Sequence, residues 1–234
     1  MPEAPGRSPS VLPKLFGLAF ITGFSGAIMP GPLLVAVIGQ TVLQGLRGVV
    51  GLITGHALLE LVTVALLAMG LQAMLGRPRV RGAVGLLGGA GLAWMGFDMV
   101  RSVPHLTLDL SQAGAQVYSW PQLIVWGAAV CAANPYFTAW WATVGAGQLA
   151  TMAPRTVPEY LSFYLGHEAS DYSWYLIVGL IIVTGRNWLT DDIYHGLIYA
   201  CGIVIALLGI AFIYTGLRSA FGARQGEDVA APAD

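Results

Sequence analysis

The chain has few charged residues. Lysine and arginine together number 11 and aspartate and glutamate 12, among 234 residues. A charged share of 10% is about half that of a soluble domain. Hydrophobic residues make up 56% of the chain and the mean hydropathy is +0.70, which excludes an ordinary soluble globular protein. The net charge of −1 gives no basic surface for a nucleic-acid partner.

Cysteine is also scarce. The two cysteines, Cys131 and Cys201, both lie inside apolar segments. We interpret them as small buried residues, which argues against a disulfide framework and a cysteine metal site. The sequence predicts no cofactor.

Long apolar runs are abundant. Six of them reach the roughly 20 residues that cross a bilayer as a helix, at 13–39, 49–75, 82–101, 122–148, 159–184 and 194–217. The sequence therefore predicts an all-α membrane protein with six transmembrane helices in a transporter domain over 13–217. Residues 1–12 form a disordered N-terminal tail in this prediction, and residues 218–234 form a C-terminal tail.

Basic residues are distributed unevenly between the two faces of this arrangement. If the spans alternate in direction, one face carries eight and the other three. By the positive-inside rule, this predicts a multi-pass membrane protein with both termini in the cytoplasm. The eight are Arg7, Lys14, Arg77, Arg79, Arg81, Arg155, Arg218 and Arg224, and the three are Arg47, Arg101 and Arg186.

One polar pattern occurs twice within the apolar runs. Gly55–Glu60 and Gly166–Asp171 both read Gly-His-x-x-x-acid, in the second and the fifth predicted span. The copies lie three spans apart, and an odd number of spans per unit means that the two halves enter the membrane in opposite senses. The sequence thus predicts two inverted three-helix repeats, 13–101 and 122–217, whose interface near the midplane is where many transporters bind substrate.

Each copy of the pattern places a histidine one helical turn from a carboxylate. Residues i and i+4 share a helix face, so His56 pairs with Glu60 and His167 with Asp171. A carboxylate within a span costs about 2.5–3.5 kcal/mol on insertion scales, which favours a functional role. We predict that these four residues couple transport to protons or hold a substrate ammonium. In the alternative, the pairs lie near the span ends, in the headgroup region. Glu168 is expected to face water.

Prolines interrupt the first and the fourth predicted span. Pro30-Gly31-Pro32 and Asn134-Pro135 break both helices, because proline lacks an N–H and clashes with the carbonyl four residues earlier. We expect this to free the carbonyls of Gly26, Ile28 and Cys131. Broken helices in transporters bind substrates at such groups, although a structural kink is the alternative. The predicted substrate-binding residues are Pro30, Gly31, Pro32, Asn134, Pro135 and Tyr136.

Glycines recur at helical spacing in the second and third spans. We interpret them as sites of close helix packing rather than of function. They are Gly48, Gly51 and Gly55, followed by Gly82, Gly85, Gly88, Gly89 and Gly91.

On these motifs the chain resembles the LysE/RhtB family of amino-acid exporters. The resemblance covers essentially the whole chain and is carried by Pro30-Gly31-Pro32, by Gly48, Gly51 and Gly55-His56, and by Asn134-Pro135. It implies a protein of the cell (inner) membrane that exports an amino acid or close derivative, driven by the proton gradient. Many relatives carry aspartate directly after the glycine of the second span, whereas this chain has His56 there and its acid at Glu60. We expect that departure to bear on which substrate the protein moves more than on its fold.

Two other function classes stay open. His56, Glu60, His167 and Asp171 would also suit a divalent metal-ion transporter, since imidazole and carboxylate bind such ions. Gly23-Phe24-Ser25-Gly26 matches the Gly-x-Ser-Gly of six-span intramembrane proteases, but a four-residue match among 31 glycines is weak. We therefore expect a transporter and not an enzyme. The partners expected are a small-molecule substrate, protons and the lipid bilayer, and the oligomeric state is left open, a homo-oligomer included.

Overall fold

The structure is a computed structural model that describes residues 11–71, 77–105, 116–185 and 190–230. Within these residues the regular secondary structure is entirely helical, as the sequence predicts. Each predicted span corresponds to one helix or to a run of consecutive helices. The first run is α1 (Val11–Ala27) and α2 (Pro32–Gln44), and the second is α3 (Leu46–Leu66) with the π-helical turn η1 (Leu67–Leu71).

The remaining helices follow in the predicted order. They are α5 (Pro78–Ser102) with the short η2 (Val103–His105), α6 (Trp120–Ala133), α7 (Pro135–Trp140), η3 (Trp141–Gly145), α8 (Ala146–Met152), α9 (Val157–Thr184) and α10 (Asp191–Ala230).

Three stretches of the described chain are long and apolar enough to cross a membrane unbroken, and five if each bent pair counts as one span. The unbroken ones are Leu46–Gly70, Gly82–His105 and Asp191–Arg218. Helix α9, the fifth predicted span, is 28 residues long but does not belong to this group. Its Glu159, Glu168 and Asp171 lower its mean hydropathy. Helix length and apolar composition together therefore support up to five crossings rather than six.

Both proline breaks are sharp bends at which a new helix begins. The axes of α1 and α2 differ by 85°, and those of α6 and of the helical segment after Pro135 by 65°. Pro32 and Pro135 are the first residues of α2 and α7, where the missing proline N–H leaves no helical hydrogen bond unmade. Gly31 precedes α2 in an extended conformation, and Asn134 caps α7 by accepting a hydrogen bond from the Tyr136 N–H at 3.0 Å.

The expectation of freed carbonyls is wrong at two of its three positions. The Met29 N–H donates to the Gly26 carbonyl at 3.2 Å, and the Asn134 N–H donates to the Cys131 carbonyl at 3.1 Å. At both breaks the last turn of the helix tightens, and an N–H donates to the carbonyl three residues earlier. The carbonyl that would have accepted from the proline N–H is therefore satisfied by the residue before the proline.

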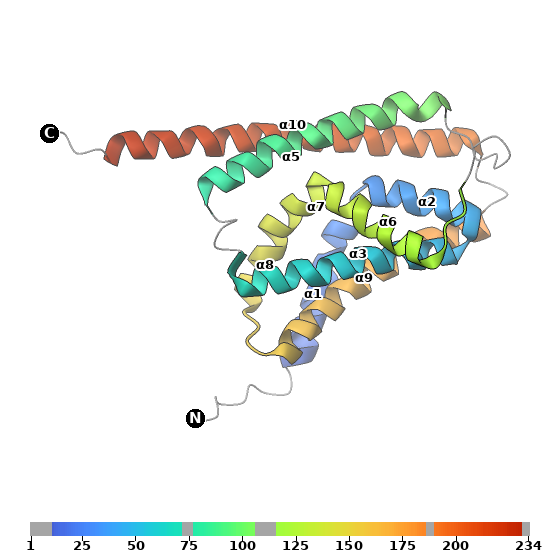
Figure 1. Cartoon of the computed structure of the whole chain (residues 1–234), viewed down its shortest axis with the longest axis horizontal. Coiled ribbons are helices and arrows are strands. Elements are labelled where there is room, and N and C mark those ends of the chain that lie inside the picture. The colour runs from blue at the N-terminus through green and yellow to red at the C-terminus, as the bar shows by residue number, and fades with distance from the viewer. Residues whose placement is uncertain (1–10, 72–76, 106–115, 186–189, 231–234) are drawn as a thin grey trace.

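The helices pack in two groups (Figure 1). α5 and α10 run side by side along one edge of the molecule, while α1 packs on α9, α6 packs on α3, and α3 and α9 meet in the centre. Gly45 joins α2 to α3 with φ 61°, a left-handed conformation that favours glycine. The largest buried apolar cluster gathers residues of α2, α3, α6, α9 and α10, including Val37, Leu52 and Ile198.

Glycines mark the closest helix contacts, as the sequence predicts. A Cβ atom added at Gly89 on α5 would lie 2.6 Å from the Ile213 nitrogen of α10, and one at Gly85 would lie 2.7 Å from the Gly216 Cα. At Gly55 on α3 it would overlap the Ile124 carbonyl oxygen of α6. Small residues therefore allow backbones to approach where larger ones would hold them apart.

The structure describes only parts of the two expected tails. Residues 1–10 and 231–234 lie outside the described residues, whereas Val11 already belongs to α1. Helix α10 continues to Ala230, so most of the predicted C-terminal tail from residue 218 is helical. The sequence after Leu217 turns polar, which ends an apolar span but does not end a helix.

Candidate functional site

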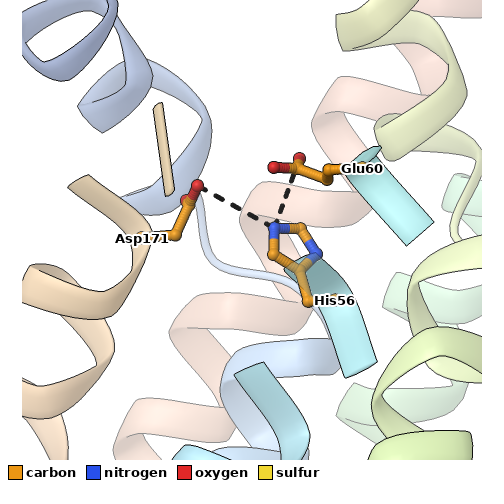
Figure 2. A group of neighbouring side chains, drawn as sticks. All are labelled: His56, Glu60 and Asp171. Carbon is orange, nitrogen blue, oxygen red and sulfur yellow. Dashed lines mark ion pairs between the residues drawn. The ribbon is translucent and has the colours of Figure 1, made fainter. Parts of the chain in front are cut away.

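The two His–acid pairs meet in one buried cluster between α3 and α9. His56 Nε2 lies 3.3 Å from Glu60 Oε1 on its own helix and 4.0 Å from Asp171 Oδ2 on the other (Figure 2). His167 Nε2 lies 3.5 Å from Asp171 Oδ2 and 3.1 Å from Glu60 Oε2. Each imidazole thus faces the acid of its own helix and the acid of its neighbour.

This cluster is hidden from solvent. The exposed fraction is 7% for His56, 3% for Glu60, 2% for His167 and 3% for Asp171. All four lie in the middle part of their helices, because α3 begins at Leu46 and α9 at Val157. Buried charges require partners, and here each histidine has two carboxylates within ion-pairing distance.

Side chains outside the cluster orient its α3 members. Trp141 Nε1 donates to Glu60 Oε1 at 2.9 Å, and Cys131 Sγ lies 3.1 Å from His56 Nδ1. Trp141 belongs to the helical segment after the Asn134-Pro135 break and Cys131 to the helix before it. The two residues that contact the His56–Glu60 pair therefore lie on either side of the second proline break, one before it and one after it.

Aromatic rings hold the α9 histidine. The ring centroid of His167 lies 5.0 Å from that of Trp140 and 5.1 Å from that of Trp141. Its Nδ1 atom is buried and has no hydrogen-bond partner among the described residues. The two histidines are thus held differently: His56 by a polar contact and His167 by packing.

One cavity connects this cluster to both helix breaks. Its volume is about 60 Å³, room for a few water molecules. It is lined by the four cluster residues, by Gly31 at the first break and by Asn134 at the second. Aromatic side chains supply much of the remaining wall: Tyr136, Phe137, Trp140, Trp141 and Tyr175.

The six residues predicted to bind substrate divide into two groups. Gly31, Asn134 and Tyr136 line the cavity. Pro30, Pro32 and Pro135 do not line it, and the latter two begin the helices that follow the breaks. Tyr136 also spans the break region, because its ring stacks on Phe212 and its hydroxyl lies 3.5 Å from the Ser25 carbonyl.

Glu168 is buried, contrary to the expectation that it faces water. Its exposed fraction is 5%, its carboxyl group neighbours that of Glu60, and its two oxygens have no hydrogen-bond partner among the described residues. It does not line the cavity. Sequence reasoning treated α9 as a helix with one functional face, whereas α1, α2 and α3 pack around it and bury other faces as well.

Trp141 and Cys131 are the other contributors that the sequence analysis did not assign. An aromatic pair in a span is typical of the membrane interface, and a lone cysteine is typical of a core, so neither residue type carried a signal. Ser25, the residue of the protease-like motif, donates its hydroxyl to the Thr22 carbonyl at 2.7 Å and does not line the cavity.

Comparisons with known proteins point in the same direction as the motifs. Residues 24–216 match the family model described as LysE type translocator. The chain is also similar to the chemotactic transduction protein ChpE of Pseudomonas aeruginosa, at 28% identity over 214 residues, which is 84% of this chain and 95% of that protein. No solved structure matches.

Proposed function

The chain belongs to the LysE type translocator family, and from that membership and the buried cluster we propose that it exports an amino acid or a close derivative, driven by the proton gradient. Membership and the apolar helices make it a multi-pass membrane transporter. We propose the amino-acid substrate, the proton as coupling ion and the outward direction from these observations together.

The single observation that carries this proposal is the cavity shared by the charged cluster and the two helix breaks. Transporters bind substrates where discontinuous helices meet near the centre of the protein. Here Gly31 and Leu33, at the start of α2, line the same space as Glu60 and Asp171. A zwitterion needs both kinds of group within the length of one small molecule.

Each end of an amino acid finds a complementary partner in this cavity. The N-cap of α2 is Gly31, which has no side chain to cap the helix. The N–H groups in the first turn after Pro32 can therefore receive a carboxylate. The ammonium group would meet Glu60 or Asp171. Because the carbonyls of Gly26 and Cys131 already accept hydrogen bonds, these carboxylates rather than backbone carbonyls are its partners. The small volume favours a small solute.

Proton coupling would use the same four residues. An ammonium that approaches Glu60 or Asp171 adds positive charge to a buried cluster, and release of a proton from His56 or His167 restores its balance. Substrate and proton then compete for one pair of carboxylates, which is the simplest arrangement for exchange of the two. Glu168, beside Glu60, adds a third carboxyl group within reach of this exchange.

We further propose six spans arranged as two inverted repeats. Two features support this arrangement. The histidines of both pairs lie ten residues after the first residue of their helix, Leu46 in α3 and Val157 in α9. In addition, the first helix of each half packs on the middle helix of the other half: α1 contacts α9, and its counterpart α6 contacts α3. In this arrangement α9 is the fifth span, and its carboxylates face the protein interior. The excess of basic residues on one face supports cytoplasmic termini in the inner membrane.

Counterflow in proteoliposomes tests the proposed function. Purified protein is reconstituted and loaded in turn with a panel of amino acids, with and without a pH gradient and with a metal chelator present throughout. We expect exchange of at least one small amino acid and accumulation that follows the pH gradient. Exchange with no member of the panel, or exchange that ignores the gradient, would contradict the proposal.

Two variants of the same type serve as a matched pair in this assay. Asp171→Asn removes a cluster carboxylate and should abolish gradient-driven exchange, whereas Asp98→Asn removes an exposed carboxylate on α5 and should leave it unchanged. A second panel of divalent cations, run without chelator, addresses the alternative of metal-ion transport through His56, Glu60, His167 and Asp171. Cation uptake without amino-acid exchange would favour that alternative.

A further inference from the structure

The four side chains of the cluster have the spacing of ligands around a single ion. A tetrahedral site with metal–ligand distances of about 2.0–2.2 Å places its ligand atoms roughly 3.3–3.6 Å from each other. The candidate ligand atoms of His56, Glu60 and Asp171 all lie within 4.8 Å of each other. His167 Nε2 lies beside this group, 3.5 Å from Asp171 Oδ2 and 3.1 Å from Glu60 Oε2, the oxygen that faces away from His56 Nε2. Three side chains are thus close enough to share one ion, and rotation of the Glu60 carboxylate would bring in His167 as the fourth ligand.

We propose that His56, Glu60, His167 and Asp171 form a binding site for one first-row divalent cation of the zinc type, and that this cation blocks transport. Two imidazole nitrogens and two carboxylate oxygens are a ligand set that suits Zn²⁺, Co²⁺ and Ni²⁺ better than Mg²⁺ or Ca²⁺, which prefer oxygen ligands.

Groups behind the ligands support this assignment. Metal-binding histidines commonly contact a second group through the ring nitrogen that faces away from the metal, and His56 Nδ1 lies 3.1 Å from Cys131 Sγ. Trp141 Nε1 holds Glu60 Oε1 at 2.9 Å, which leaves Oε2, an atom without a hydrogen bond, beside His167. Asp171 Oδ2 is likewise buried without a hydrogen bond and faces both imidazoles.

Replacing the protons of two imidazoles by one divalent cation leaves the net charge of the four side chains unchanged. Two protonated imidazoles and two carboxylates carry no net charge, and neither do one dication, two neutral imidazoles and two carboxylates. Entry of the cation therefore releases up to two protons and leaves the charge of the buried cluster unchanged, so that acid should weaken binding. The cavity gives an ion room beside the ligands, because all four line it.

The number of protein ligands is the reason why we expect the bound cation to inhibit transport. A site closed by four protein ligands is typical of ions that stay bound, whereas a transported solute has to leave. The ion would also join α3 to α9 and occupy the carboxylates that we assign to the substrate ammonium. This second step rests on the proposed function, while the binding itself does not.

Titration of the untagged, chelator-treated protein in detergent with Co²⁺ tests the binding. Four-coordinate Co²⁺ absorbs visible light much more strongly than the hydrated ion, and Zn²⁺ should displace it. We expect one Co²⁺ per chain and at least about a tenfold loss of affinity in His56→Gln and His167→Gln. His105→Gln, which changes an exposed histidine, should bind as the unmodified protein does. Absence of the absorption band, or equal affinity in all variants, would overturn the proposal.

Two further measurements keep the outcome interpretable. The unmodified protein should bind Co²⁺ more weakly as the pH falls, which needs no variant and so does not depend on whether the variants fold. Zn²⁺ added to the counterflow assay should slow exchange in the unmodified protein, and a chelator should restore the original rate; exchange that Zn²⁺ leaves unchanged would contradict the inhibitory role. Binding without amino-acid exchange would retain this inference and contradict the proposed function, and exchange without binding would do the reverse.

Discussion

The α3–α9 pair and the α5–α10 pair are two helix interfaces that are held together by different means. Between α5 and α10, glycines such as Gly85, Gly89 and Gly96 bring backbones into contact. Between α3 and α9, two histidines and two carboxylates meet in a buried cluster. Close backbone contact characterises one pair, and charged side chains characterise the other.

We propose that this difference separates an interface that serves packing from one that serves transport. Close backbone contact stabilises α5 and α10 by dispersion without any group that could exchange a ligand. The α3–α9 pair instead buries charges that are costly unless they are paired, a cost that a purely structural interface has no reason to bear. We therefore expect substitutions at the two interfaces to have different consequences: loss of transport at one and loss of stability at the other.

The largest effect is expected at Glu60, which contacts both histidines. Glu60→Gln retains the volume of the side chain and an oxygen that can accept the Trp141 hydrogen bond, but it removes the charge. Gradient-driven export should fall to background while the protein still inserts and elutes as a folded species. Export in proteoliposomes, with Asp98→Asn as the control, checks this. Undiminished export would show that the charged interface is not the functional one.

Next in size is the effect of overpacking the glycine interface. Gly96→Leu on α5 places a side chain against the backbone of Gly202 and Ala206 on α10. Overpacking costs roughly 1–3 kcal/mol, so thermal unfolding in detergent should occur at lower temperature. Gly196→Leu on α10 is the matched control, since a Cβ atom there meets nothing within 4 Å. Equal melting of the two variants would remove the basis for calling this interface a packing element.

A smaller effect is expected from the tryptophan that orients Glu60. Trp141→Phe removes the donor of the 2.9 Å hydrogen bond and retains an aromatic ring beside His167. We expect a cost of about 1 kcal/mol in substrate affinity, seen as a several-fold rise in the concentration needed for half-maximal exchange. Trp94→Phe, an exposed tryptophan on α5, should change nothing. A Trp141→Phe curve that overlays the unmodified one would show that Glu60 needs no such donor.

The smallest effect is expected at a hydrogen bond between α3 and α9 that carries no charge. The Tyr164 hydroxyl donates to the Ala57 carbonyl at 3.0 Å. Tyr164→Phe should lower the free energy of unfolding by about 0.6 kcal/mol, the average for a hydrogen bond within a membrane, and leave export intact. Unfolding in detergent and counterflow measure the two. A large loss of export would extend the functional region beyond the charged cluster.

Much of the site could be predicted from the sequence because its signals are local. A histidine and an acid four residues apart share a helix face wherever the helix lies, and proline breaks a helix in any surroundings. The repetition of both features in two halves indicated that they belong together. The glycine contacts were predictable for the same reason, since small residues at helical spacing have few other uses in a span.

What the sequence did not reveal depends on neighbours that are distant in the chain. Glu168 was expected to face water, and it is buried because three other helices cover α9. The carbonyls of Gly26 and Cys131 were expected to be free, and each is taken by an N–H three residues later. Trp141 and Cys131 gained their roles from the bend at Asn134, whose direction no local pattern specifies.

A double-mutant cycle on His167 and Glu60 tests the central claim, that the two halves share one ionisable unit, most directly. Each residue is replaced by glutamine singly and together, and the free energy of unfolding in detergent is measured for all four proteins. Contact between His167 Nε2 and Glu60 Oε2 at 3.1 Å predicts a coupling of about 1–3 kcal/mol, so the double variant is little less stable than either single one. Losses that simply add would contradict the claim.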